Sequence, residues 1–444
     1  MRQEWFPKEW RRWVQQIGER LPTPTRRHLG MLLDGIVLAR GLRTVTSWLR
    51  AMGKRRRWST FYYAIGAIGR KTEAVSCALL SILVERIVGE DSVIRLALDD
   101  TPTRRYGPKV QGAGIHRDPA PGPSGSPFLY GHIWVTLSLV QRHPLWGTMG
   151  LPLLGWLYIR AKDLATMRRR PWRFQTKLEM ARKLVEAALG VISPSGKKLW
   201  VLVDGGYTKR PFLRPLRKKG VTVIGRLRKD AALWTVPPEP GAKRPVGRPA
   251  TYGTQRIVLA KRAGQKRGWR DLSVTLYGEH TIKRIKTFEA TYRPAGGRVR
   301  VVIVQEKSGP LAFFSTDPAV SAREILEAVA DRSTIEQDFL DVKEVVGTGQ
   351  QQLRNVWANV GAWNLNLWAH TLVELWAWNQ PKSTLVNRSD SPWDRADRRP
   401  SHADRRKALT RAVHAQGISR HWAPCALDRR NSLWLGRLIS KLAS

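Results

Sequence analysis

A series of short apolar runs between residues 93 and 224 limits what this chain can fold into. Each run has the length and apolar content of a buried strand, and the runs cover residues 93–98, 131–140, 150–159, 199–203 and 221–224. Residues 174–192 instead carry the apolar spacing of an amphipathic helix. Strands in succession, followed by strand–helix–strand, predict an α/β fold built on a mixed sheet with helices on its faces.

The segments around these strands divide the chain into five predicted parts. They are a helical domain over 1–90, a first core part over 91–229, a β-rich insertion over 230–298, a second core part over 299–378 and a basic tail over 379–444. The insertion is predicted from short alternating segments, which are typical of strands. The second core part carries a helix that contains the acidic residue Glu336.

The helical N-terminal part has the features of a DNA-binding domain. Gly41 lies in a predicted turn between two helices, as in a helix-turn-helix. A run of four bases follows, consisting of Lys54, Arg55, Arg56 and Arg57. We expect these bases to bind the DNA backbone; the alternative is a helical bundle with a solvated basic face.

The charge of the chain indicates a polyanionic partner. Lys and Arg number 77 against 35 Asp and Glu, which gives a net charge of +42. A chain with this excess repels itself unless something neutralises it. The bases are spread along the sequence rather than placed beside an apolar anchor, so we expect double-stranded DNA and no membrane as the partner.

Cysteine content and hydropathy narrow the class of protein further. Cys77 and Cys425 are the two cysteines, and they lie far apart, so a disulfide framework or a cysteine zinc site is not expected. The sequence also shows no cysteine–histidine cluster, which argues against zinc chemistry. No signal peptide or membrane-spanning run is recognisable, and we expect a cytoplasmic protein associated with the nucleoid when bound to DNA.

A predicted helix over residues 331–347 combines an apolar stripe with a charged face. The stripe consists of Ile335, Phe339, Val342 and Val346, and Gly347 is a natural helix stop. Asp317 is the expected N-cap of this helical region.

The polar residues of the same helix fall into two groups. At about 100° per residue, Arg332, Glu336 and Lys343 share one narrow face. Asp338 and Asp341 point elsewhere and are interpreted as bystanders. An ordinary i,i+4 ion pair on a solvated helix is the alternative reading of Arg332 and Glu336.

Three acids stand where they can converge on a metal. Asp100 is expected at the end of one strand and Asp204 at the end of another, while Glu336 lies on the later helix. Three carboxylates bind hard cations such as Mg²⁺ through oxygen, and Mn²⁺ can substitute. Two such ions suit attack on a phosphodiester bond. Each acid taken alone could equally cap a turn.

Asp99 is the competitor of Asp100 for the first position in this set. The two residues are adjacent, and neighbouring side chains of a strand point to opposite faces. Only one of them is therefore expected to bind metal. A phosphate-binding loop with the pattern Gly-x-x-x-x-Gly-Lys is missing, which argues against a nucleotide hydrolase.

Several motifs together resemble the DDE transposases of bacterial insertion sequences. The matching stretches are Leu98-Asp-Asp-Thr101, Val203-Asp-Gly-Gly-Tyr207, Gly225-Arg-Leu-Arg-Lys-Asp230, Ser315-Thr-Asp317 and Arg332-x-x-x-Glu336 with Lys343. They occur in the order typical of that family and cover roughly residues 90–370. Val329 stands where the family signature usually has Tyr.

The resemblance implies an RNase H-like fold with a β-rich insertion between the second Asp and the Glu. It implies that Asp100, Asp204 and Glu336 are the catalytic, metal-binding residues, the family pattern favouring the acid before Thr101. It also implies that Arg332 and Lys343 bind the transposon-end DNA near the cut.

Other basic positions are weaker candidates for DNA contacts. Arg226 and Arg228 lie in the Gly225–Asp230 stretch. Arg248, in Gly247-Arg-Pro249, resembles the core of a minor-groove hook, although a basic linker is the plainer interpretation. His116 and His132 flank a Pro- and Gly-rich loop, and we expect them to be structural.

The function expected from these observations is that of a DNA transposase. Two Mg²⁺ ions would support cleavage at the inverted-repeat ends of the element and transfer of the strand into target DNA. Because both ends are cut together, a homodimer on DNA is expected. The alternatives are another RNase H-like nuclease, or a DNA-binding protein derived from an inactive transposase.

Overall fold

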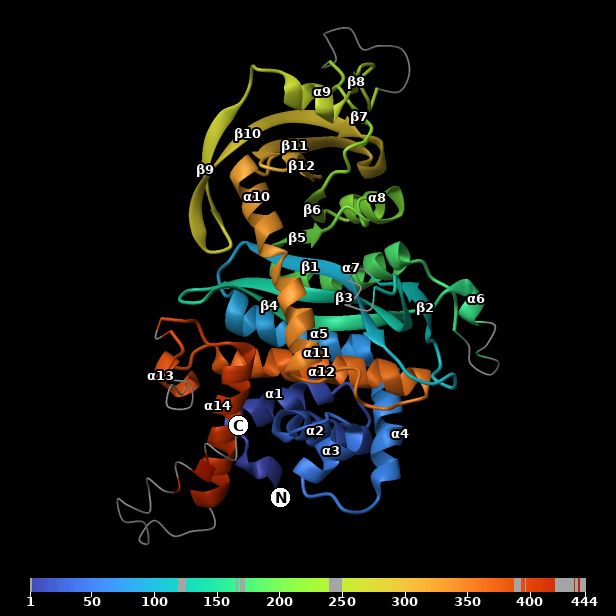
Figure 1. Ribbon diagram of the computed structural model, residues 1–444, viewed down its shortest axis with the longest axis vertical. Coiled ribbons are helices and arrows are strands. Elements are labelled where there is room, and N and C mark those ends of the chain that lie inside the picture. The colour runs from blue at the N-terminus through green and yellow to red at the C-terminus, as the bar shows by residue number, and fades with distance from the viewer. Residues whose placement is uncertain are drawn as a thin grey trace.

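The computed structural model describes residues 2–118, 125–164, 167, 172–238, 250–386, 393–395 and 397–419, with residues 435, 438 and 439. The molecule is elongated (Figure 1). Helices from the two ends of the chain lie at one end of the long axis. The middle of the sheet crosses the centre, and the strands of the insertion lie at the other end.

Twelve strands of the described residues form one sheet in the order β2-β3-β1-β5-β6-β12-β11-β10-β7-β8, with β4 on β3 and β9 on β10. The strands of the first half are β1 (Val93–Arg104), β2 (Gly114–Arg117), β3 (Phe128–His143), β4 (Gly147–Tyr158), β5 (Lys198–Val203) and β6 (Thr222–Arg226). β1 runs antiparallel to β3 and parallel to β5, and β5 runs parallel to β6. The order β4-β3-β1-β5-β6, with helices on both faces, confirms the predicted RNase H-like α/β class.

β1 is longer than the sequence predicted. An end near Asp100 was expected, but the strand continues to Arg104 because β3 offers it a partner as far as Gly131. β5 stops earlier, since its last pair with β1 joins Leu98 to Val203. The two adjacent aspartates therefore lie inside β1, at the point where its other neighbour ends.

The insertion joins the main sheet. Its strands are β7 (Leu233–Trp234), β8 (Arg256–Ile257), β9 (Arg270–Leu276) and β10 (Glu279–Tyr292), with helix α9 (Leu259–Gly264) among them. β10 pairs with β11 (Gly297–Glu306), which pairs with β12 (Gly309–Ser315), and β12 pairs with β6. Hydrogen bonds thus run without a break from the first strands to the insertion.

Helices cover both faces and one end of the sheet. The N-terminal ones are α1 (Lys8–Gly18), α2 (Thr23–Leu38), α3 (Val45–Ala51), α4 (Trp58–Gly69) and α5 (Thr72–Leu83). α6 (Ala161–Leu164), α7 (Lys177–Ile192) and α8 (Arg210–Lys218) follow, and the later ones are α10 (Ala322–Asp331), α11 (Thr334–Glu344), α12 (Val356–Ala377), α13 (Lys382–Leu385) and α14 (His402–Ser419). As predicted, a turn at Gly41 with φ of +60° connects two helices, α2 and α3.

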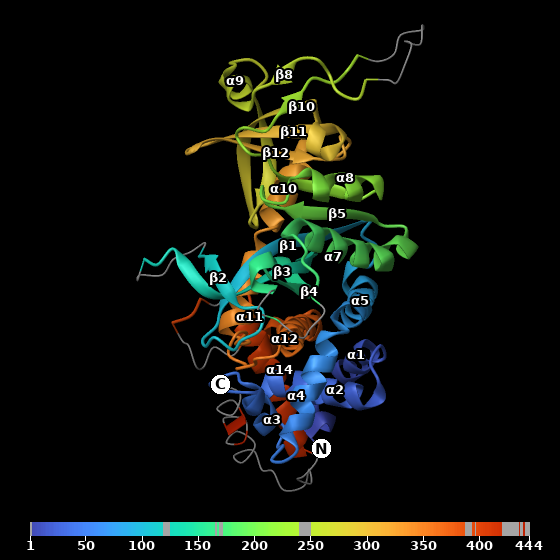
Figure 2. The same ribbon diagram turned by 90° about the vertical axis from the view of Figure 1, so that its right-hand side faces the viewer.

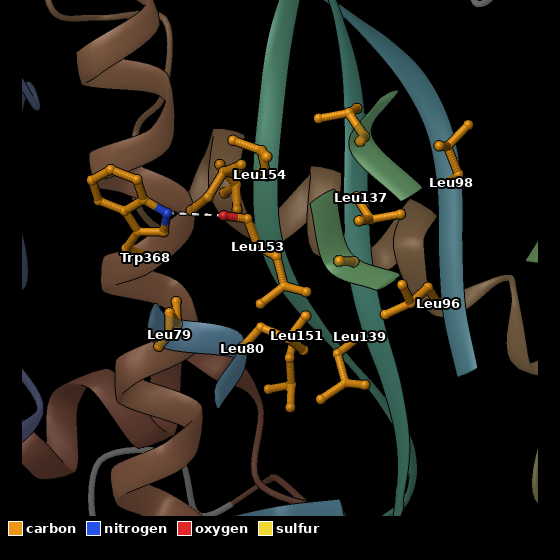
Figure 3. Packing of buried hydrophobic residues seen from close by; sticks show 14 of the residues in the cluster. Leu79, Leu80, Leu96, Leu98, Leu137, Leu139, Leu151, Leu153, Leu154 and Trp368 are labelled. Atoms are coloured by element: carbon orange, nitrogen blue, oxygen red, sulfur yellow. Dashed lines mark hydrogen bonds between the residues drawn. The ribbon is translucent and has the colours of Figure 1, made fainter. Parts of the chain in front are cut away.

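α12 is the centre of the core. All but one of its residues are buried, and it lies between the sheet and the N-terminal helices (Figure 2). Its Trp368 indole donates a hydrogen bond of 2.9 Å to the carbonyl of Leu153 in β4. Around this contact, leucines of α5, β1, β3 and β4 fill the space (Figure 3).

One continuous apolar cluster runs from Phe6 to Val413 through this layer. The five predicted parts therefore share a core, and their limits remain predictions. Within the described residues, no helix is long and apolar enough to span a membrane.

The contact of α4 with α12 depends on two glycines. A Cβ on Gly361 would overlap the carbonyl oxygen of Ile65, and one on Gly69 would overlap the carbonyl oxygen of Trp357. The two helix backbones can therefore pack directly on each other.

A Gly361→Ala substitution is expected to lower the free energy of unfolding by about 3 kcal/mol, because two helix backbones must separate to admit one methyl group. Gly190→Ala is the matched control, since nothing lies within 4 Å of a Cβ at this exposed position of α7. That change should stabilise the protein by about 0.5–1 kcal/mol through helix propensity. Urea unfolding measures both; equal effects of the two changes would contradict the close packing.

The neutral imidazole of His132 holds the loop after β1 in place. Its Nε2 lies 3.0 Å from the carbonyl oxygen of Gln111, and its Nδ1 accepts a hydrogen bond of 3.1 Å from Arg105. Burial, helped by the nearby Arg105, lowers the pKa of His132 to about 3. This structural role is the one that the sequence favoured.

The unfolded chain takes up a proton at His132 below pH 6.5, whereas the folded chain does not until about pH 3. Stability should therefore fall as the pH drops through this window. In His132→Gln, the loss between pH 7.5 and pH 5 should be smaller than in the parent by about 2 kcal/mol. Urea unfolding at the two pH values tests this, and His280→Gln, at an exposed position, should keep the parental loss. Equal losses in all three proteins would refute it.

Candidate active site

The helix predicted over 331–347 is broken at its start. α10 ends at Asp331 and α11 begins at Thr334, with Arg332 and Ser333 between them. The N-cap of α10 is Ser321, whose hydroxyl accepts from the Glu324 amide while the Glu324 carboxylate accepts from the Ser321 amide.

The prediction of Asp317 as N-cap was wrong. Its carboxylate instead accepts a hydrogen bond from the amide of Ala319 within the preceding turn, which leaves the cap to Ser321. After α11 the backbone of Gly347 has φ of +80°, in agreement with the predicted helix stop.

The apolar stripe of α11 sets which face of β1 the helix covers. The four predicted members, Ile335, Phe339, Val342 and Val346, are all buried. Ile335 and Phe339 form a cluster with Ala97 of β1 and Val140 of β3. Because strand side chains alternate, Asp99 and Thr101 point to the same face as Ala97.

Two basic residues fasten α11 to β1 on this face. The guanidinium of Arg332 lies 2.7 Å from Asp99 Oδ2 and 3.0 Å from Glu336 Oε1. The ammonium of Lys343 donates a hydrogen bond of 2.7 Å to the hydroxyl of Thr101. Burial lowers the pKa of Lys343. Both bases, predicted to bind DNA, thus have protein partners in this structure.

Asp99 is a half-buried acid whose pKa is shifted. Burial raises its pKa to about 6, Arg332 opposes the rise and the charge of Asp204 adds to it. Asp204 directly follows β5, and continuing the register from Leu98 and Val203 places it beside Asp99. Its carboxylate accepts a hydrogen bond of 2.9 Å from the amide of Gly206.

Asp100 has different partners. Its carboxylate lies 2.5 Å from the ammonium of Lys177, the first residue of α7, and accepts a hydrogen bond of 2.9 Å from the hydroxyl of Tyr207. Even-numbered residues of this part of β1, such as Leu96 and Leu98, belong to the main apolar cluster, together with leucines of α5 and β4 (Figure 3). Alternation therefore turns Asp100 away from the face that carries Glu336.

Glu336 is the exposed member of the group. Its side chain is 63% exposed. It borders an open groove of about 820 Å³ between the β3–β4 turn, the β9–β10 turn and the junction of α10 with α11. Tyr277, at the tip of the β9–β10 turn, and Leu340 of α11 also line this groove.

The donors on this face are suited to a divalent cation. Asp99, Asp204 and Glu336 offer carboxylate oxygens, which Mg²⁺ and Mn²⁺ prefer. Burial raises the pKa of Asp99 and the charge of Asp204 adds to the rise, so a cation on this face would lower that pKa again. Arg332 forms ion pairs with both Asp99 and Glu336. Among the described residues, the carboxylate oxygens of Asp99, Asp204 and Glu336 do not all lie within 4.8 Å of one another. A cation would have to draw them together.

Arg226 lies beside Asp204 when the register from Val203 and Gly225 is continued, whereas the other predicted DNA-contact residues lie apart from this face. Lys54 is half-buried and Arg55, Arg56 and Arg57 are exposed in the loop between α3 and α4. Arg226 is exposed at the end of β6. Arg228 is exposed and paired with Asp230 at 3.0 Å, whereas Arg248 lies outside the described residues.

Sequence reasoning missed several residues around the site. Lys177 gave no signal, because neither its position nor its type indicates a partner on β1. Tyr207 belongs to the Val203–Tyr207 motif, but its hydrogen bond to Asp100 was not predicted. Asp338 and Asp341, interpreted as bystanders of the Glu336 face, point away from it, and Asp338 is buried on the far side of α11. His370 and Glu374 were also missed; they are four residues apart on α12, and this i,i+4 spacing was the available signal.

Comparison with known families places this geometry in context. The model of the DDE superfamily endonuclease family matches residues 17–293, well over half of the chain. The matched region holds Asp99, Asp100 and Asp204, and Glu336 lies beyond it. No curated protein matches the chain. With its RNase H-like sheet and the acids at the end of β5, the chain belongs to the DDE superfamily endonucleases.

Proposed function

We propose that the protein is a DNA transposase that cleaves the ends of its element and joins them to target DNA. The observation that carries the proposal is the gathering of Asp99, Asp204 and Glu336 toward one face of the sheet, with Arg332 joining the first and the last. An endonuclease family and a net charge of +42 support a DNA substrate.

We assign the first acid to Asp99 rather than Asp100. The carboxylate of Asp99 shares a guanidinium with Glu336 and senses the charge of Asp204. Asp100 is engaged by Lys177 and Tyr207 on the other side of β1. A cation held by Glu336 and Asp204 would lie on the face of β1 that carries Asp99 and not on the face that carries Asp100.

Two divalent ions, when bound, would activate a water molecule or a 3′-hydroxyl and stabilise the leaving oxygen. Residues of the chain hold the acids in position when no ion is bound. Arg332 offsets the repulsion between Asp99 and Glu336, and Lys343 fixes Thr101 next to them. With Asp99 and Glu336 bound to a cation, the guanidinium of Arg332 would be free to bind a DNA phosphate.

The groove beside Glu336 is the proposed path of the cleaved strand. It lies between the core and the insertion, so both parts contact the same DNA segment. The exposed bases of the α3–α4 loop would bind the phosphate backbone elsewhere on the duplex, and Arg226 would bind it beside Asp204. A homodimer on DNA, with one chain for each end of the element, completes the proposal.

The choice of acids is tested by nicking of supercoiled plasmid in Mg²⁺ or Mn²⁺. Asp99→Asn, Asp204→Asn and Glu336→Gln should each slow nicking by roughly 100-fold or more, the scale of losing a group that stabilises charge in a transition state. Asp100→Asn should cost less than tenfold, and Asp271→Asn, at an exposed position of β9, should cost nothing. An inactive Asp100→Asn beside an active Asp99→Asn would reverse the assignment.

Strand transfer separates a transposase from a nuclease that only hydrolyses. The substrate is a labelled duplex with the terminal sequence that borders the gene, cut to leave a 3′-hydroxyl, and the target is supercoiled plasmid. We expect labelled plasmid to form in the parent and to be lost in Glu336→Gln. Nicking without any joined product would instead support the nuclease alternative.

A further inference from the structure

A second cluster of ionisable residues lies on the other side of α11, away from the proposed active site. Asp338 and Asp341 of α11 meet His370 and Glu374 of α12 there, and His402 begins α14 beside them. Four of the five are at most 3% exposed. These residues line a cavity of about 250 Å³ that plays no part in the reaction proposed above.

The cluster brings metal-binding atoms together. One atom each from His370, Glu374 and His402 lie within 4.8 Å of one another, the single such group among the described residues. His402 Nδ1 is 2.6 Å from Glu374 Oε1, and the two imidazole rings stack with centroids 3.9 Å apart. Ligands of tetrahedral zinc sit about 2 Å from the ion, hence roughly 3.3 Å apart, so only a small closure is needed.

Several buried polar atoms of the cluster lack a hydrogen-bond partner. They are both ring nitrogens of His370, Nε2 of His402 and Oδ2 of Asp338. His370 Nε2 lies 3.9 Å from Asp341 Oδ2, too far for a hydrogen bond. A buried polar group without a partner costs about 1–3 kcal/mol, so four such atoms around one cavity indicate that something binds them.

The excess negative charge of the cluster also favours a bound cation. Asp338, Asp341 and Glu374 are three acids, and Arg405 neutralises one charge by an ion pair of 2.5 Å to Glu374 Oε2. Two excess negative charges remain if both histidines are neutral.

We propose that His370, Glu374 and His402, with Asp341 as the fourth ligand, form a structural zinc site. Two imidazoles and two carboxylates suit tetrahedral Zn²⁺, whereas Mg²⁺ prefers oxygen ligands alone. Arg405 keeps one oxygen of Glu374 and orients the other toward the ion, as outer partners of metal ligands do. The ion would clamp the start of α14 to α12 and α11.

This site revises the expectation that the chain has no zinc chemistry. The expectation was drawn from the lack of a cysteine–histidine cluster in the sequence. Here His402 stands 32 residues after His370, beyond the end of α12, and Asp341 comes from another helix. The proposal is independent of the catalytic assignment, since Asp204 and Asp99 take no part in it.

Zinc content provides the test. The full chain without an affinity tag is loaded with ZnSO₄, desalted over chelating resin, and analysed by mass spectrometry of the element. We expect one zinc ion per chain in the parent, in His280→Gln and in Asp204→Asn. His370→Gln and His402→Gln should each retain less than a tenth of this. An empty parent, or histidine variants with full zinc, would overturn the proposal.

Because the two variants could fail to fold, a measurement on the unaltered chain accompanies them. Apo-protein titrated with Co²⁺ should develop the intense visible absorption of four-coordinate cobalt, saturating at one ion per chain, and Zn²⁺ should abolish it. Removal of zinc should also lower the melting temperature. A cobalt titration without this absorption would overturn the proposal, whatever the variants do.

Discussion

The burial of α12 is the interaction on which the rest of the structure depends. The helix packs against β4 on one side and against α2 and α4 on another, and the Trp368 indole bonds to the β4 backbone. Because it is buried on nearly all sides, α12 depends on both layers around it to remain folded. The N-terminal helices and the catalytic sheet are therefore parts of one cooperative core.

The alternation of side chains along β1 then divides the chemistry of the site. Asp99 and Thr101 meet Arg332 and Lys343 of the α11 region, whereas Asp100 meets α7 and Tyr207. A shift of one residue in the pairing of β1 with β3 would exchange these faces. The ten-residue antiparallel register between the two strands holds this choice in place.

The sequence predicted the elements well where one periodicity dominated. The strands around Leu98, Leu137 and Val203 and the stripe of α11 followed from apolar spacing alone. The site was predicted in part: the acids came from motifs, and Lys177 and the buried histidines were missed. Their contacts join residues far apart in the chain, and local patterns carry no record of such pairs. The end of β1 was misjudged for the same reason, since β3 supplies its later partners.

The continuity of the sheet has a consequence for how the chain can be divided. β6 is an inner strand because β12 pairs with it, and β12 is made more than eighty residues later. A fragment that stops before the insertion would leave one edge of β6 unpaired, because β5 covers only the other edge. An open strand edge is a template for aggregation. During synthesis the same edge waits for β12, which follows the insertion in the chain. The catalytic core and the insertion are thus one folding unit, although the sequence presents them as separate parts.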